Sequence, residues 1–184
     1  MSDIIKKVQA EVKRECQKDS NIYEMNAYGH FVHVAEYGKI LAKKRKADSE
    51  IIELAAWMHD IGSVLGDMTN HHIVGAKYAG ELLAKYNYSQ DKIEAVQHCI
   101  LAHRGSQKIK RETLEAICLA DADAMTHFDR VADLFRLALV SMKMDYKEAE
   151  KFVYEKLGRS YKKLTPTAKK IVKKKYEAVK VLFG

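Results

Sequence analysis

The sequence predicts an all-α fold, and three observations lead to this prediction. Apolar residues recur at three- and four-residue intervals along almost the whole chain, as on one face of an α-helix. No segment alternates apolar and polar residues for long enough to indicate a strand. The 184 residues include only nine glycines and one proline, too few turn-forming residues for an all-β sandwich. We therefore expect a single all-α domain of about eight or nine helices.

Four helices are expected in the first part of the chain, from their apolar spacing and their end signals. Their expected ranges are 3–18, 25–46, 50–60 and 71–86. Asp48 or Ser49 is expected to cap the third helix and Asn70 the fourth. Gly62 is expected to stop the third helix at its C-terminal end.

The rest of the chain is expected to be helical as well. The expected ranges are 90–103, 111–128, 131–142, 145–158 and 166–183. Arg104 and Gly105 are expected to end the first of these, and a break or bend near Asp129 separates the second from the third. Thr165 is expected to cap the last helix, with Pro166 at its first position.

The net charge of +7 is carried by the C-terminal part of the chain. Residues 143–184 contain 13 Lys and Arg against 5 Asp and Glu, a balance of +8, whereas residues 1–142 have a balance of −1. The last helix is expected to dock its apolar stripe on the domain and leave its lysines in solvent. The charge therefore makes no strong case for nucleic-acid binding, although contact with an anionic surface stays an alternative.

The cysteines and the start of the chain indicate a reducing, cytoplasmic protein. Cys16, Cys99 and Cys118 are odd in number and form no CxxC pair, so neither a disulfide framework nor a thiolate zinc site is expected. The first residues are charged throughout and no apolar run approaches 18 residues, so no membrane segment is expected.

Two segments place carboxylates where a metal ion would bind. His59 and Asp60 end an apolar helix, and neighbouring side chains at a helix end are able to bend onto one ion. Asp121 lies on an apolar stripe, so its carboxylate is expected to point inward, where an unpaired charge is costly. A metal ion or a buried salt bridge would satisfy Asp121, and the metal is favoured because no Lys or Arg lies within one turn. Asp123 is expected on the opposite face and need not be part of any site.

The eight histidines all lie between residues 30 and 127. His30 and His33 share a helix face, and either is a candidate ligand. His103 continues an apolar stripe and is a better candidate than His98, while periodicity does not decide between His71 and His72.

The chain resembles the HD-domain superfamily of metal-dependent phosphohydrolases over roughly residues 25–140. Three segments carry the resemblance: HFVHV from His30, AAWMHDIG around His59 and Asp60, and ICLADADAM around Asp121. Ser63 stands where many members have a lysine. The resemblance selects His30 over His33, so that His33 and His127 are expected to be structural. The basic segment 143–184 is expected to be a helical extension outside this catalytic core.

The resemblance implies a divalent metal ion bound by His30, His59, Asp60 and Asp121. Imidazoles and carboxylates without a thiolate suit Mn²⁺, Fe²⁺, Co²⁺ or Ni²⁺ better than a structural zinc ion. Some members bind a second ion, for which the family pattern indicates His71 and His103, with His72 and His98 as reserves. One ion and two ions are both compatible with the sequence.

The implied reaction is hydrolysis of a small phosphorylated compound, most plausibly a nucleotide, by a metal-activated water. Asp60 is expected to take part in catalysis, and Arg104 is the best candidate for holding the phosphate. Lys77 is a further candidate, whereas Lys108 and Lys110, near Arg111 in the same loop, are expected to be solvated. The alternatives are a di-iron oxygenase on the same fold and a non-catalytic nucleotide-binding regulatory module. An oligomer is compatible with either function.

Overall fold

The fold is seen in a computed structural model of the chain, which describes residues 2–104 and 109–183. Gly105 and Lys108, both named in the sequence predictions, lie outside the described residues. The described elements are α1 (Asp3–Cys16), α2 (Met25–Arg45), α3 (Ser49–Met58), α4 (Ile61–Val64), α5 (His71–Lys85), α6 (Gln90–Ala102), α7 (Leu114–Thr126), α8 (Val131–Arg136), the π-helical turn η1 (Leu137–Ser141), α9 (Tyr146–Lys163) and α10 (Pro166–Phe183). The predicted all-α fold is confirmed over this part of the chain.

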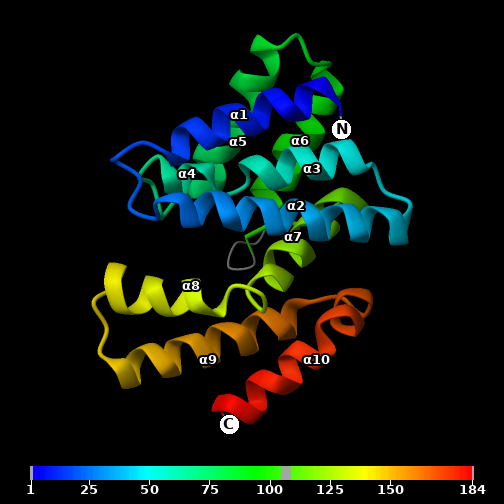
Figure 1. Ribbon diagram of the computed structural model, residues 1–184. Coiled ribbons are helices and arrows are strands. Elements are labelled where there is room, and N and C mark those ends of the chain that lie inside the picture. The colour runs from blue at the N-terminus through cyan, green and yellow to red at the C-terminus, as the bar shows by residue number, and fades with distance from the viewer. Residues whose placement is uncertain (1, 105–108, 184) are drawn as a thin grey trace.

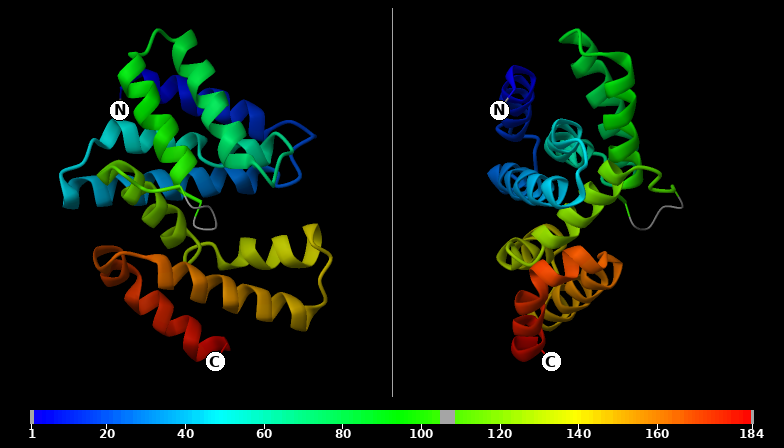
Figure 2. Two further views of the ribbon diagram at one scale, coloured as in Figure 1. Left: turned by 180° about the vertical axis from the view of Figure 1, so that it is seen from behind. Right: turned by 90° about the vertical axis from the view of Figure 1, so that its right-hand side faces the viewer.

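The helices form a larger body and a smaller layer, with α7 between them (Figure 1). The body consists of α1 to α6, and α8, α9 and α10 form the layer, as both views in Figure 2 show. Helix α7 packs on α2 and α3 in the body and on α9 and α10 in the layer. Its residues from Cys118 to Thr126 are all buried, so other parts of the protein surround this helix on every side.

Several helix ends follow the signals in the sequence. Asp48 caps α3 by accepting hydrogen bonds from the backbone N–H groups of Glu50 and Ile51. Thr113 caps α7 in the same way, and Asp145 forms a capping box with Glu148 at the start of α9. These caps satisfy backbone donors that have no partner within the helix.

Two of the differences between the expected and the observed helix ends concern the site. Gly62 does not stop a helix; it lies inside α4, where a Cβ atom would come within 2.4 Å of the His71 carbonyl oxygen. A glycine is needed there because the backbones of α4 and α5 approach closely. Helix α9 also continues past residue 158 to Lys163, which brings one further turn of basic residues to the body.

The last helix docks on the domain through Ala168, Val172 and Val179, which are buried. Lys175 on the same helix donates a hydrogen bond to the Tyr37 hydroxyl and forms an ion pair with Asp129. Within the described residues, no helix is long and apolar enough to cross a lipid bilayer.

Candidate metal centre

Four side chains from α2, the α3–α4 junction and α7 converge on one point. Nε2 of His30 lies 3.2 Å from Nε2 of His59 and 4.0 Å from Oδ2 of Asp60. Oδ1 of Asp123 lies 3.6 Å from Nε2 of His30 and 4.0 Å from Nε2 of His59. Ligand atoms on adjacent corners of an octahedral ion stand about 3 Å apart, since each lies about 2.1 Å from the metal. This group, which we call the first ligand group, therefore has nearly the size that one bound ion requires.

Asp60 also faces a second pair of histidines with its other oxygen. Oδ1 of Asp60 lies 3.4 Å from Nε2 of His71 and 3.3 Å from Nε2 of His103. His71 is the first residue of α5 and His103 follows the last residue of α6, so both project from helix ends. Asp60, His71 and His103 are the second ligand group, and Asp60 belongs to both groups.

The orientation of the imidazole rings leaves their Nε2 atoms available to an ion. Nδ1 of His59 donates a hydrogen bond to the Ala56 carbonyl, and Nδ1 of His103 donates to the Ile100 carbonyl. Nδ1 of His71 likewise donates to the Met68 carbonyl. Because a carbonyl only accepts, each Nδ1 carries a proton, and Nε2 is the ring nitrogen that faces the Asp60 carboxylate, which raises the pKa of His103 above its ordinary value. Such backbone bonds are the usual way of orienting metal-binding histidines.

The unmet hydrogen-bonding needs of the site fit a bound cation. Oδ1 of Asp60 is buried and accepts no hydrogen bond from the residues that the structure describes. Buried acceptors of this kind are costly unless a proton donor or a metal ion satisfies them. The residues present therefore fit one divalent ion in each ligand group.

Burial and neighbouring charges set the ionisation of these groups. Burial lowers the pKa of His59 to about 4 and holds that of His30 below its ordinary value, which keeps both rings neutral at pH 7. Burial alone would raise the pKa of Asp60, but the imidazoles of His59, His103 and His71 hold it well below its usual range. Lys163 and His127 likewise overcome burial at Asp123 and lower its pKa. Neutral imidazoles and ionised carboxylates are the protonation states that bind a metal.

The structure does not place Asp121 at the metal centre, contrary to the sequence prediction. Asp121 is buried as expected, but its Oδ2 accepts a hydrogen bond from Arg45 at 2.7 Å. Its Oδ1 accepts one from the Thr165 backbone at 3.0 Å, and the Thr165 hydroxyl also bonds to the carboxylate. Asp121 thus forms the buried salt bridge that was the alternative, and its partner comes from α2 rather than from its own helix. Asp123 supplies the carboxylate from α7 instead.

The remaining histidines divide into those at the site and those away from it. His127 was expected to be structural, yet its Nε2 lies 3.8 Å from Oδ1 of Asp123 while its Nδ1 bonds to the Ser160 hydroxyl. His33 bonds to the carbonyl of Gly29 on its own helix, and Nε2 of His98 accepts from the Glu112 backbone. His72 is buried beside His71, but neither His72 nor His98 belongs to either ligand group.

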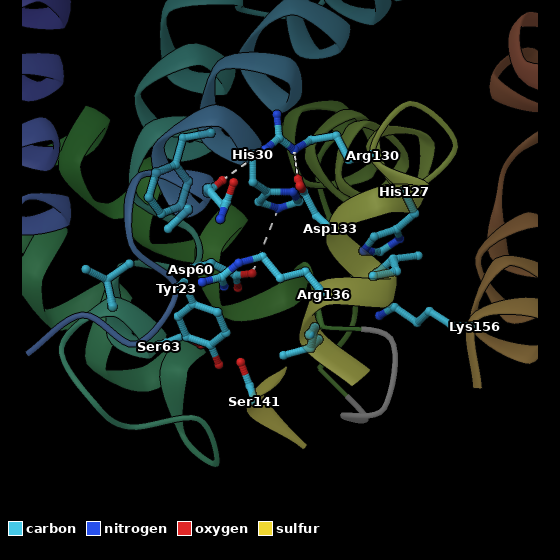
Figure 3. Close-up of a pocket in the computed structure, with 16 residues that line it drawn as sticks. Tyr23, His30, Asp60, Ser63, His127, Arg130, Asp133, Arg136, Ser141 and Lys156 are labelled. Carbon is cyan, nitrogen blue, oxygen red and sulfur yellow. Dashed lines mark hydrogen bonds and ion pairs between the residues drawn. The ribbon is translucent and has the colours of Figure 1, made fainter. Parts of the chain in front are cut away.

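Two cavities border the ligand groups on different sides. A cavity of about 550 Å³, which we call the basic cavity, is lined by ligand residues and by the cations Arg104, Lys156, Arg159 and Lys163. A cavity of about 230 Å³, the mixed cavity, has both apolar and polar walls that include Tyr23, Phe31, Leu134 and Arg136. Figure 3 shows the mixed cavity, with Tyr23 and Ser63 on one side and His127 and Lys156 on another. Both cavities are lined by Asp60, so both open on the metal centre.

The positions of the candidate phosphate-binding cations agree only partly with the sequence expectations. Arg104 lines the basic cavity, where it also donates a hydrogen bond to the Thr69 carbonyl. Lys77 faces solvent in an ion pair with Glu81, away from both cavities. Arg111 bonds to the carbonyls of Ala102 and His103 and so caps the end of α6, while Lys110 is exposed.

Sequence reasoning missed the contribution of α9. Lys156, Arg159, Ser160 and Lys163 follow the spacing i, i+3, i+4 and i+7, which places them on one helix face, and all four line the basic cavity. Nζ of Lys163 lies 3.7 Å from Oδ2 of Asp123. Their spacing was a visible signal, but the strong positive charge of the whole segment made a solvated face the simpler interpretation.

Comparisons with known proteins agree with this geometry. The family model for the HD domain matches residues 27–127, which include all the residues of both ligand groups. Ribonuclease Y of Borreliella burgdorferi is 34% identical over 108 residues, which cover 56% of this chain and 19% of the relative. Ribonuclease Y of Wolinella succinogenes is 31% identical over 138 residues, or 74% of this chain and 24% of the relative. The chain thus matches only about a fifth to a quarter of the length of these curated relatives.

Solved structures share the fold over most of the chain. The Bacillus subtilis protein YpgQ in complex with ADP has a TM-score of 0.68 and 21% identity, covering 92% of this chain and 90% of its own. A predicted HD superfamily hydrolase from an uncultured Thermotogales bacterium has a TM-score of 0.58 and 24% identity, covering 83% of this chain and 84% of its own. With the family match over more than half of the sequence, the chain belongs to the HD-domain superfamily of metal-dependent phosphohydrolases.

Proposed function

We propose that this protein hydrolyses a small phosphorylated compound of the nucleotide class at a centre of two divalent metal ions that share Asp60. The observation that carries the proposal is the position of the Asp60 carboxylate. Its Oδ2 faces His30 and His59, and its Oδ1 faces His71 and His103, at 3.3 to 4.0 Å in each case. A carboxylate between two histidine pairs is suited to bridge two ions about 3.5–4 Å apart, the spacing of two-metal phosphatases.

The donor set bears on the kind of metal. Each ligand group offers imidazole nitrogens and carboxylate oxygens, and the described cysteines are buried elsewhere. This set suits Mn²⁺, Fe²⁺, Co²⁺ or Ni²⁺ better than a structural zinc site. When bound, such ions polarise a phosphoryl oxygen and lower the pKa of a coordinated water towards 7.

The protein's own side chains would hold the substrate against this centre. Arg104, Arg159 and Lys163 line the basic cavity next to the second ligand group. Guanidinium groups bind phosphate oxygens in a bidentate manner, so Arg104 and Arg159 are suited to fix the phosphate in line with the attacking water. The carboxylates of Asp60 and Asp123, whose pKa values are lowered, would hold the ions.

Two comparisons bear on the substrate class, in different directions. A nucleotide is supported by the cavity size and by the ADP bound to the structurally similar YpgQ protein. The name of the ribonuclease Y relatives points to RNA, but the chain matches only 19% of the Borreliella burgdorferi protein. We therefore do not propose RNA cleavage, and the test below includes an RNA substrate to distinguish it.

The test combines metal analysis with a substrate panel. The freshly purified protein is analysed for metals, supplied with Mn²⁺, and assayed against nucleoside mono-, di- and triphosphates, other phosphomonoesters and a single-stranded RNA. We expect release of phosphate or pyrophosphate from a small phosphorylated compound, reduced at least 100-fold by Asp60→Asn and unchanged by His98→Ala, which alters a histidine outside both groups. Oxygen consumption with bound iron, RNA cleavage alone, or the absence of any turnover would overturn the proposal.

A further inference from the structure

Lys156 occupies an unusual position between the two cavities. The residues that line both of them are Asp60, His127 and Lys156, and Lys156 is the one with an ammonium group. Its side chain extends from α9 into the pocket on the same side as His127 (Figure 3). Lys156 also lies outside residues 27–127, so it belongs to a part of the chain that the HD family model does not match.

The ammonium group of Lys156 has no carboxylate partner of its own. Its neighbours on the same helix face are engaged: Lys163 pairs with Asp123, and Arg159 pairs with Glu155. Lys156 forms no ion pair or hydrogen bond with any side chain in residues 2–104 and 109–183. Burial lowers the pKa of Lys156 from its ordinary value, and the charges of Asp123 and Asp60 act in the opposite direction.

A partly buried ammonium without an ion-pair partner costs stability, because burial removes part of its hydration and the more distant carboxylates of Asp123 and Asp60 only partly offset this loss. A side chain of this kind is explained when a bound anion supplies the missing partner. The anion would also have to lie beside the Asp60 carboxylate, where the two ligand groups meet, and that is where the reacting phosphorus is expected.

We propose that Lys156 is a substrate-contacting residue, which binds the phosphate oxygens of the bond being cleaved at the junction of the two cavities. This inference rests on the proposed function for the nature of the substrate. It assigns phosphate groups to the basic cavity and the organic part of the substrate to the mixed cavity, which has apolar walls. It also makes α9 a wall of the active site rather than an extension outside it.

The test uses ADP as the probe and four forms of the full chain with Mn²⁺ present: the wild type, Lys156→Met, Lys156→Arg and Lys162→Met. Lys162 is exposed on the same helix and controls for the loss of one positive charge. We expect Lys156→Met to weaken ADP binding, measured by titration calorimetry, about 10- to 100-fold, because a charge-assisted hydrogen bond is lost. Lys156→Arg should retain part of the affinity, and Lys162→Met should bind within about twofold of the wild type.

Thermal unfolding is a second measurement that distinguishes substrate binding from a purely structural role. If Lys156 were structural, the Tm of Lys156→Met would fall. Lys156→Met should leave the Tm unchanged or raise it, because an uncompensated charge is replaced by an apolar chain of similar length. A Tm lower by more than a few degrees, or a wild type that binds ADP no better than Lys156→Met, would overturn the inference. ADP binding that depends on Lys156 in a protein without hydrolytic activity would instead overturn the proposed function and leave this inference standing.

Discussion

Oδ1 of Asp123 lies 3.6 Å from Nε2 of His30, which joins the buried helix α7 to α2 at the metal centre. Two residues earlier on the same helix, Asp121 forms a salt bridge with Arg45 at the opposite side of α7. The two carboxylates therefore have different tasks: Asp123 belongs with the histidines, and Asp121 fastens α7 to α2 and to the start of α10.

These tasks predict opposite effects of two matched substitutions. Asp123→Asn should lower Mn²⁺ affinity at least tenfold and destabilise the metal-free protein less than Asp121→Asn does, because its partner Lys163 is partly exposed. Asp121→Asn should retain the metal but lower the free energy of unfolding by about 3 kcal/mol, because the partly buried Arg45 loses its buried counter-charge. Metal titration and urea unfolding of both variants check the prediction. Loss of metal from Asp121→Asn with retention in Asp123→Asn would reverse the assignment.

The second ligand group predicts which histidine of α6 matters for metal content. His103→Ala should reduce the bound ions from two per chain to about one, because Asp60 and His71 alone provide too few ligands. His98→Ala, on the same helix, should leave both ions in place, since His98 bonds to the Glu112 backbone instead. Elemental analysis after equilibration with excess Mn²⁺ and gel filtration distinguishes the two. Equal losses in both variants would contradict a role for His103.

The close approach of α4 and α5 predicts the effect of a single methyl group. Gly62→Ala would place a Cβ atom 2.4 Å from the His71 carbonyl oxygen, so His71 must move and the second ligand group must open. We expect the free energy of unfolding to fall by about 2 kcal/mol, together with weaker binding of the second ion. Gly158→Ala is the control, because a Cβ atom there has no neighbour within 4 Å, and it should raise the stability of α9 by about 0.5–1 kcal/mol. Equal stability changes would show that the contact at Gly62 is unimportant.

Glu50 predicts a pH dependence of stability away from the metal centre. Hydrogen bonds from Lys92 and Tyr88 lower the pKa of Glu50 from 4.5 to about 2. Because the folded state binds this proton less readily than the unfolded state, the stabilisation is complete above about pH 4.5 and is lost as the pH falls towards 2. Glu50→Gln should be less stable than the wild type at pH 6 by about 1 kcal/mol or less, since the pair is partly exposed. Denaturant unfolding at pH 6, 4 and 3 should show this difference shrinking; a constant difference would contradict it.

The sequence predicted the helical fold for a clear physical reason, since the helical spacing of apolar residues determines the fold class. It also predicted His59 and Asp60 as candidate ligands from their place at a helix end, whereas the choice of His30 over His33 came from the family resemblance. The structure brings these three side chains together.

The sequence alone does not decide whether Asp121 or Asp123 faces the histidines. Helix α7 is buried on all sides, so a single apolar stripe does not identify the face that lies toward the site. Arg45, the partner of Asp121, comes from a distant segment that no local pattern relates to it.

The role of α9 was missed for a related reason. Net charge describes a segment as a whole, whereas a site depends on which side of the helix each charge occupies. Lys156, Arg159 and Lys163 face the basic cavity, while Lys162 between them is exposed. Only the packing of α9 against α7, a contact between distant parts of the chain, separates these two groups of lysines and arginines.

If Asp60 bridges two metal ions, anomalous diffraction from a crystal of the Mn²⁺-loaded protein should show two manganese peaks about 3.5–4 Å apart. One should lie among His30, His59 and Asp123 on the Oδ2 side of Asp60, and the other beside His71 and His103 on its Oδ1 side. A single peak, or a peak bound by Asp121 in place of Asp123, would show that Asp60 does not bridge two ions in this way.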